Sequence, residues 1–143
     1  MEISGNVKFR GADIAALYDF DYLNVQARAR DLVDAFMFFA SDRNSPFETD
    51  DIRSLTQSFT PNLITSRALL AGYQSITPLN DDEWQALPLI LRSRWIQMRL
   101  RGSRKVPENE QLDFVITNFA VVTDWLHRAG REFFTQLRHD SPA

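Results

Sequence analysis

The chain has 143 residues, 44% of them hydrophobic, and a formal net charge of −3 at pH 7. This length and composition indicate a single globular domain with its own core and argue against a disordered chain. The absence of cysteine excludes disulfides, thiolate zinc sites and cysteine nucleophiles, and the slight negative charge provides no general attraction to nucleic acid or anionic membranes.

Two further absences narrow the class of protein. No apolar run reaches the roughly 18 residues that a membrane span needs, and the N-terminus has no basic segment followed by an apolar one. The two histidines, His127 and His139, are too few for a histidine-rich metal site. We therefore expect a cytoplasmic protein without nucleic-acid or membrane partners.

The first 21 residues predict a β-hairpin. Residues 7–9 and 14–20 are short apolar and aromatic runs of the kind found in strands. Residues 10–13 lie between them, where Gly11 tolerates positive φ and Asp13 can bond its own backbone, so they favour a turn. A two-stranded hairpin is marginal alone, so this one must pack against other structure.

The rest of the chain, residues 31–138, is predicted to be a helical body. A mostly apolar segment that Asp31 opens predicts a buried helix, and a short helix is expected around Ile52 and Leu55. Asn62 is a suitable N-cap for the helix that follows it. The predicted fold is one domain over residues 1–143, mainly α-helical with a small N-terminal β-hairpin.

A long central helix is predicted from residue 81 to about residue 101. Asn80 and Glu83 resemble a capping box, and Pro88 is expected to break or kink the helix. One face of this helix is expected to be apolar and central to the core; it carries Leu87, Leu91, Trp95 and Met98.

Two more helices complete the prediction. Pro107 suits a first helical turn, and apolar residues at helical spacing predict one amphipathic helix that ends at Arg128 and Gly130. Its apolar face comprises Leu112, Val115, Ile116, Phe119, Val122 and Leu126. A short final helix is expected over residues 131–138, with Phe133, Phe134 and Leu137 on its apolar side.

The hairpin also carries candidate metal ligands. In an antiparallel pair, the residue before the first strand, Asn6, lies near the residue that ends the second, Asp19. Amide and carboxylate oxygens suit Mg²⁺, which usually takes one or two protein carboxylates and completes its shell with water and substrate phosphates. Asp21 shares the face of Asp19 on a continued strand, where it is either a second metal contact or a solvated carboxylate. The alternative interpretation is that Asn and Asp are simply common at strand ends and turns.

These residues carry a resemblance to a known family. The segments Asn-Val-Lys-Phe at 6–9, Ala-Ala-Leu-Tyr-Asp-Phe-Asp at 15–21 and Arg-Asp-Leu at 30–32 resemble the C-terminal part of the aminoglycoside/choline phosphotransferases. This resemblance implies the helical C-lobe of a protein-kinase-like fold, with Mg²⁺ and ATP as cofactors and a small-molecule alcohol as substrate. Asn6 matches the catalytic-loop Asn, Asp19 the metal-binding Asp, and Asp31 the Asp that supports the catalytic loop.

The helical region extends the resemblance. The run Ala-Leu-Leu-Ala-Gly-Tyr-Gln-Ser at 68–75, with Pro-Leu at 78–79 and Ala-Leu-Pro at 86–88, is similar to the homoserine-kinase-like branch. The substrate that this implies is homoserine, while amino sugars, choline-like alcohols and sugar amines remain open.

The chain also departs from the family pattern. The catalytic Asp is expected five residues before Asn6, where Met1 stands, and Gln26-Ala27 replaces the usual Gly-Pro before the Asp-Leu helix. The resemblance therefore predicts a C-lobe fragment without the catalytic loop's His-Gly-Asp and without the nucleotide-binding lobe. No catalytic residue is assigned, and we expect the isolated chain to have no useful kinase activity, since phosphoryl transfer depends on those parts for positioning and charge neutralisation.

Three arginines of the central helix are candidates for binding an anionic substrate: Arg92, Arg94 and Arg99. The alternative is that they pair with nearby acids or extend from a buried helix into solvent.

A second function hypothesis is a non-catalytic helical module that binds a partner or itself. Apolar surface beside the hairpin, left uncovered by a missing lobe, would favour a homodimer formed through the hairpin or its edge strand.

Overall fold

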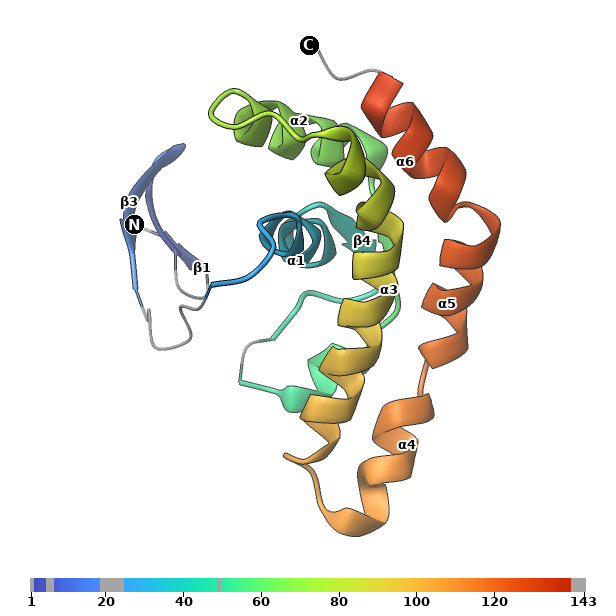
Figure 1. Ribbon diagram of the computed structural model, residues 1–143. Helices are drawn as coiled ribbons and strands as arrows, with labels where there is room; N and C mark the ends of the chain where they lie inside the picture. Colours follow the sequence, from blue (N-terminus) through green and yellow to red (C-terminus); the bar gives the residue numbers. More distant parts are fainter. Residues whose placement is uncertain (1, 5–6, 19–24, 49, 140–143) are drawn as a thin grey trace.

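The computed structural model describes residues 2–4, 7–18, 25–48 and 50–139. A small antiparallel sheet at the N-terminus lies beside a helical body, as the sequence predicts (Figure 1). The helices are arranged around one long helix, α3, with α1 between it and the sheet.

The N-terminal sheet has one strand more than predicted. Strand β1 (Glu2–Ser4) pairs with β2 (Val7–Arg10), which also pairs with β3 (Asp13–Leu17). Gly11 adopts a φ of 63° in the turn between β2 and β3, the left-handed conformation that its lack of a Cβ allows. Residues 2–4 carry no strand pattern in the sequence, and they form a strand because they pair with β2.

Helix α1 (Ala29–Phe39) leads into a second, two-stranded sheet. Its strands, β4 (Ser41–Arg43) and β5 (Phe59–Pro61), are antiparallel and enclose the 3₁₀ helix η1 (Ile52–Thr56). The short helix expected around Ile52 is therefore confirmed. The two strands are too short to show an alternating pattern in the sequence, which explains why they were not predicted.

Arg43 of β4 links the second sheet to helix α1. Its Nη2 donates to the carbonyl of Met37 at 2.7 Å, and its guanidinium carbon lies 5.3 Å from the ring centroid of Phe59. The rings of Phe38 and Phe47 lie 5.8 and 5.6 Å away, so three aromatic residues surround one cation. Burial lowers the pKa of Arg43 from its ordinary value.

Helix α2 (Leu63–Gln74) begins where the sequence predicts. The side chain of Asn62 accepts hydrogen bonds from the backbone N–H groups of Ile64 and Thr65, at 3.0 and 3.2 Å. The N-cap prediction for Asn62 is therefore confirmed.

Helix α3 (Asp81–Ser103) has 23 residues and runs without interruption through Pro88. Asn80 and Glu83 form the predicted capping box. Pro88 has no N–H for the preceding turn, yet Trp84, Leu87 and Leu91 on either side are buried, and this packing holds the helix together. Of the two outcomes expected at Pro88, a break is thus wrong.

The chain after α3 is divided into three helices before the last one. They are the 3₁₀ helix η2 (Glu108–Glu110), α4 (Gln111–Ile116) and α5 (Phe119–Arg128). The prediction of one continuous amphipathic helix is wrong. Asn118 interrupts it with a φ of 56°, a conformation that Asn tolerates better than most residues.

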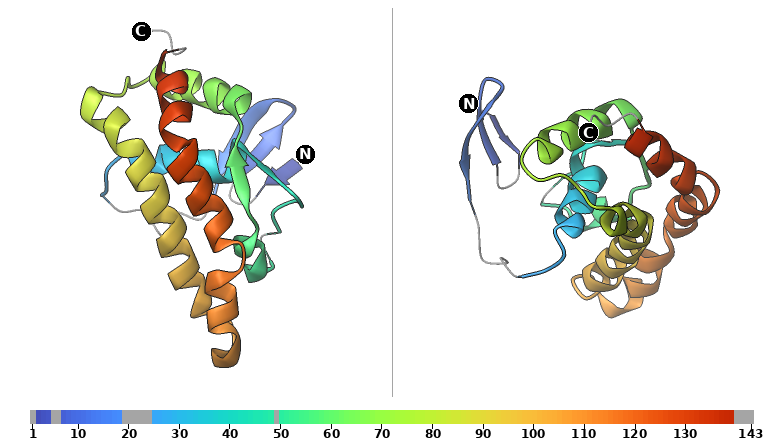
Figure 2. Two further views of the ribbon diagram at one scale, coloured as in Figure 1. Left: turned by 90° about the vertical axis from the view of Figure 1, so that its right-hand side faces the viewer. Right: turned by 45° about the horizontal axis from the view of Figure 1, so that its top comes forward.

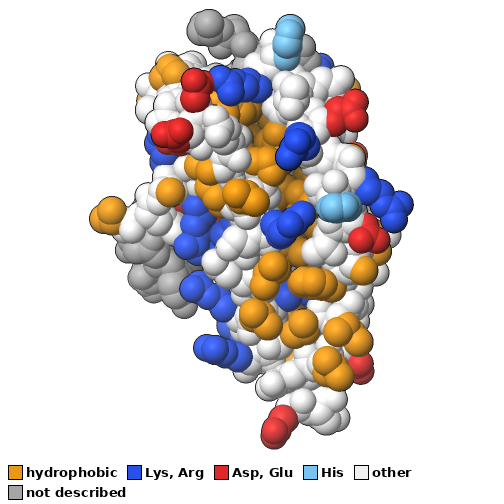
Figure 3. All heavy atoms as spheres, turned by 45° about the vertical axis from the view of Figure 1, so that its right-hand side comes forward, with side chains coloured by type: hydrophobic (Ala, Val, Ile, Leu, Met, Phe, Trp, Pro, Cys, Tyr) orange, Lys and Arg blue, Asp and Glu red, His pale blue; other side chains and the backbone are white. Residues whose placement is uncertain are grey.

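The break rotates α4 away from the predicted face. Leu112 and Ile116 are 70% and 57% exposed, whereas Phe114 is 3% exposed and packs inside. Val122 and Leu126, which follow the break, are buried as predicted. Apolar side chains consequently reach the surface on the face that α3, α4 and α5 form (Figure 3).

The core lies where α1, α3 and the last helix, α6 (Gly130–His139), meet (Figure 2). These helices supply mainly Leu32, Val33, Phe36 and Met37, then Trp84, Leu87, Leu91 and Trp95, then Phe133, Phe134 and Leu137. The predicted apolar side of the last helix is confirmed. Met98, predicted beside Trp95, is partly buried at the edge of this core.

Candidate functional site

The pairing of β2 with β3 determines which strand ends lie together in the N-terminal sheet. Val7 pairs with Leu17, so the start of β2 and the end of β3 lie side by side. A β-bulge between Lys8 and Phe9 shifts the register toward the turn, where Phe9 pairs with Ile14. The three proposed ligands, Asn6, Asp19 and Asp21, lie outside the described residues. Their donor chemistry, amide and carboxylate oxygens, suits Mg²⁺.

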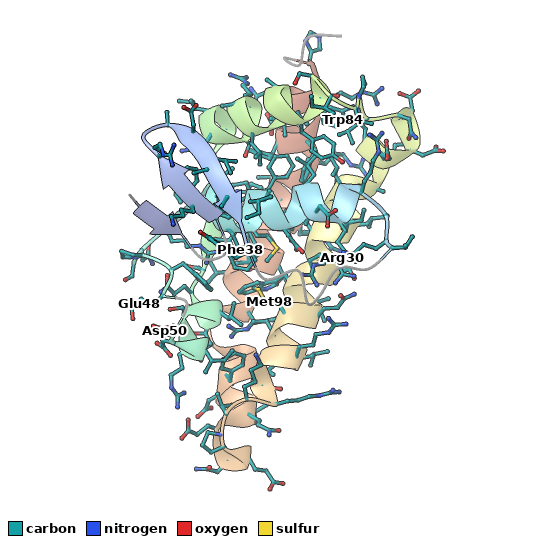
Figure 4. All side chains as sticks on the ribbon, turned by 90° about the vertical axis from the view of Figure 1, so that its left-hand side faces the viewer. Arg30, Phe38, Glu48, Asp50, Trp84 and Met98 are labelled. Atoms are coloured by element: carbon teal, nitrogen blue, oxygen red, sulfur yellow. The ribbon has the colours of Figure 1, made fainter. Side chains whose placement is uncertain are left out.

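The connector before α1 turns directly into the helix. The N–H of Arg30 donates to the carbonyl of Ala27 at 2.9 Å, so Ala27 is the first residue of this turn. Asp31 lies in the first turn of α1, where a carboxylate is favoured by the helix dipole. Its Oδ1 accepts a hydrogen bond of 3.4 Å from Nε2 of Gln26. Figure 4 views this side of the molecule, with the sheet in front of α1.

Arg28 anchors this connector to the start of α3. Its guanidinium pairs with both carboxylate oxygens of Glu83, at 2.5 and 2.6 Å. It also donates to the carbonyls of Thr77 and Pro78, which precede α3. The hydrogen bond from Arg28 lowers the pKa of Glu83, and the pKa of Arg28 is raised by the same contact. The capping carboxylate of α3 thus also holds the residue that begins α1.

The three candidate arginines of α3 have different surroundings. Arg94 makes a two-pronged ion pair with Asp34 of α1, at 2.7 and 2.8 Å. Arg92 is exposed on the side of α3 that faces α5 and α6. Arg99 is fully buried. The structure therefore does not bring the three together at one surface, and only Arg92 keeps its guanidinium in solvent.

Arg99 has a structural role. Its guanidinium donates to the carbonyl oxygens of Leu55, Val115 and Thr117, and the rings of Trp95 and Phe114 lie 5.1 Å from its central carbon. Burial lowers its pKa to about 10, so it still carries its charge at neutral pH. Because Arg99 binds carbonyls at the end of α4, it stabilises the helix break beside Asn118.

The described residues include no group of three or more His, Asp or Glu side chains arranged to hold a metal ion. In the same part of the chain, no helix combines the length and the hydropathy that crossing a membrane requires.

Comparison with known proteins gives one link to a function. A homoserine kinase of Mesorhizobium japonicum is 33% identical to this chain over 95 residues. This similarity is distant and partial, since the aligned region covers 66% of the chain and 25% of that kinase. No family profile matches the chain, and no solved structure matches it either.

Sequence reasoning missed two of the residues that organise this region, Arg28 and Asp34. Their partners, Glu83 and Arg94, lie 55 and 60 residues away in the chain. Contacts at such separations leave no local pattern. The only local signal is the pair of basic residues Arg28 and Arg30 just before the predicted helix.

Proposed function

We propose that this chain is the C-lobe of an ATP-dependent phosphotransferase that acts on the hydroxyl group of a small molecule. The observation that carries the proposal is the partial similarity to a homoserine kinase, together with the order of Asn6, Asp19 and Asp31 in the sequence. The aligned part of the chain covers only 25% of the length of that kinase. The helical body and the small sheet are compatible with such a lobe.

In this proposal the residues have separate roles. Asn6 and Asp19, with Asp21 beside them, hold Mg²⁺, which neutralises charge on the transferred phosphoryl group. Asp31 supports the catalytic loop, which by the resemblance ends at Asn6. The Arg28–Glu83 pair fixes the start of α1 against the start of α3. The acceptor alcohol is a small molecule, with homoserine the first candidate.

A magnesium titration followed by amide NMR tests the metal site. We expect shifts centred on the Asn6 side-chain amide and on the backbone amides of Asp19 and Asp21, because these groups supply the ligands. The variant Asp19→Asn should lose the response, since it removes the carboxylate charge. Asp13→Asn is the matched control, because Asp13 is exposed at the opposite end of β3.

Either of two results would remove the site. One is an absence of shifts at these residues, and the other is an equal loss of response in both variants.

The wider proposal is tested by the DNA upstream of Met1. An in-frame stretch that encodes His-Gly-Asp supports it, whereas a stop codon directly upstream contradicts it.

The exposure of the sheet favours a second function, self-association without catalysis. Ile14, Leu17 and Tyr18 are 62%, 53% and 45% exposed, and β3 is an edge strand with unpaired backbone groups. A second copy is the simplest partner for such an edge.

Light scattering after size exclusion tests this alternative at high protein concentration. We expect a dimer that Leu17→Lys weakens, because charge on an edge strand opposes strand pairing. Ile116→Lys, at a similarly exposed apolar position in α4, should leave the dimer intact. A monomer at every concentration would exclude the alternative.

A further inference from the structure

A groove lies on the side of α3 that faces away from the N-terminal sheet. It is formed by α3, α5 and α6 and has a volume of about 840 Å³. Helix α1 lies between the sheet and α3, whose other side contributes to the groove (Figures 1 and 2). None of the residues proposed for the metal site lines this groove.

The rim of this groove is basic. Arg92 comes from α3, Arg128 from the end of α5, and Arg131 and Arg138 from α6, while none of the groove residues is acidic. In Figure 3, arginine and lysine side chains lie on both sides of an apolar strip on this face. The guanidinium groups that have no carboxylate partner give this hollow a positive potential that favours an anion.

Two of these arginines already have partners. Arg138 pairs with Asp81, and its guanidinium lies 5.9 Å from the ring centroid of Trp84. Arg128 lies 3.9 Å from Asp124, four residues earlier on α5. Across the described part of the chain, neither Arg92 nor Arg131 has a carboxylate within ion-pair distance. These two guanidinium groups keep all their donors available for a ligand.

The floor of the groove is apolar. Trp84, Leu126 and Phe134 lie at its base, with Pro88 and Leu89 beside them on α3. The first three are 8%, 6% and 4% exposed, so they form a preformed surface held by the core. An inorganic anion would use the rim and leave this surface in water. A ligand with an apolar or aromatic part covers it, and the groove volume lies within the usual range for small-molecule sites.

We propose that this groove binds a small organic phosphate monoester. Arg92 and Arg131 hold the phosphate group, because the guanidinium fork matches phosphate oxygens with two parallel hydrogen bonds. The apolar part of the ester lies over Trp84 and Leu126. Arg128 and Arg138 add charge at the rim while keeping their own contacts within the fold.

Isothermal titration of the full chain with 1-naphthyl phosphate at low ionic strength tests the proposal. We expect saturable binding, with roughly tenfold weaker affinity for inorganic phosphate and for neutral 1-naphthol, since each lacks one half of the recognition. Amide NMR should place the shifts at the Trp84 indole N–H and at residues of α5 and α6 that border the groove.

The double variant R92Q/R131Q should weaken binding at least about tenfold, because it removes the charged donors to the phosphate. Its matched control is R101Q/R104Q, which removes the same charge from exposed arginines of α3 and its C-terminus outside the groove. The control should stay within about twofold of the original chain. All four arginines are exposed, and circular dichroism verifies that each variant is folded.

Three results would overturn the proposal. These are no saturable binding, an equal loss in the two double variants, or equal affinity for inorganic phosphate, which indicates adventitious anion binding only. The variant Asp19→Asn should bind 1-naphthyl phosphate normally, so a failure of the proposed metal site and a failure of the groove are separable.

Discussion

Replacing Arg99 with methionine is expected to lower the free energy of unfolding by about 3 kcal/mol, because three carbonyl oxygens lose their charged donor. Those carbonyls belong to Leu55, Val115 and Thr117, on two separate segments that pack against α3. Methionine fills much of the buried volume but has no donor. Urea unfolding followed by circular dichroism measures the loss.

Two companion variants give this prediction its controls. Arg101→Met changes an exposed arginine two residues further along α3 and should alter the stability by less than about 0.5 kcal/mol. Arg99→Lys keeps the charge but replaces a planar fork with a single ammonium group, so it should restore only part of the loss. If Arg99→Met is as stable as the original chain, water or a rearranged backbone satisfies these carbonyls.

Replacing Gly102 with alanine is expected to destabilise the fold by about 2 kcal/mol, although alanine is normally the better helix former by about 1 kcal/mol. A Cβ at Gly102 would lie 2.7 Å from both Cε1 and Cζ of the Phe114 ring. That ring is 3% exposed and packs against Arg99, so it has little room to move. The measurement is again the midpoint and slope of urea unfolding.

Gly72 provides the matched control for this substitution. It lies within α2, and a Cβ added there meets nothing within 4 Å. Gly72→Ala should therefore stabilise the chain by about 0.5 kcal/mol, through helix propensity alone. Equal effects at Gly72 and Gly102 would show that Phe114 repacks freely and would contradict the close contact.

The sequence predicts the fold class and most helix starts because these depend on short-range signals. Asn62 and the Asn80–Glu83 pair specify their caps within three residues, and aromatic spacing specifies the buried side of α6. The break at Asn118 was not predicted because apolar periodicity continues through it. Arg99 stabilises this break by donating to the carbonyl of Thr117, which lies 18 residues further along the chain.

In the candidate site, too, local features can be predicted from the sequence and long-range contacts cannot. The pairing of β2 and β3 follows from a turn glycine and two apolar runs, so the approach of their ends could be predicted. The different environments of Arg92, Arg94 and Arg99 could not be predicted. Each depends on which helix packs against the side of α3 that carries the residue. Helical periodicity groups residues by face, but it does not identify the neighbour.

The way the N-terminal sheet is attached has a thermodynamic consequence. Among the described residues, strands β1 to β3 pair with one another but make few contacts with the helices, whereas α1, α3 and α6 share one core. The sheet and the helical core are therefore expected to open as separate cooperative units. A ligand bound at the end of the sheet would slow hydrogen exchange there while leaving the melting temperature of the helices nearly unchanged. Thermal-shift screens that follow the helices would consequently overlook such a ligand.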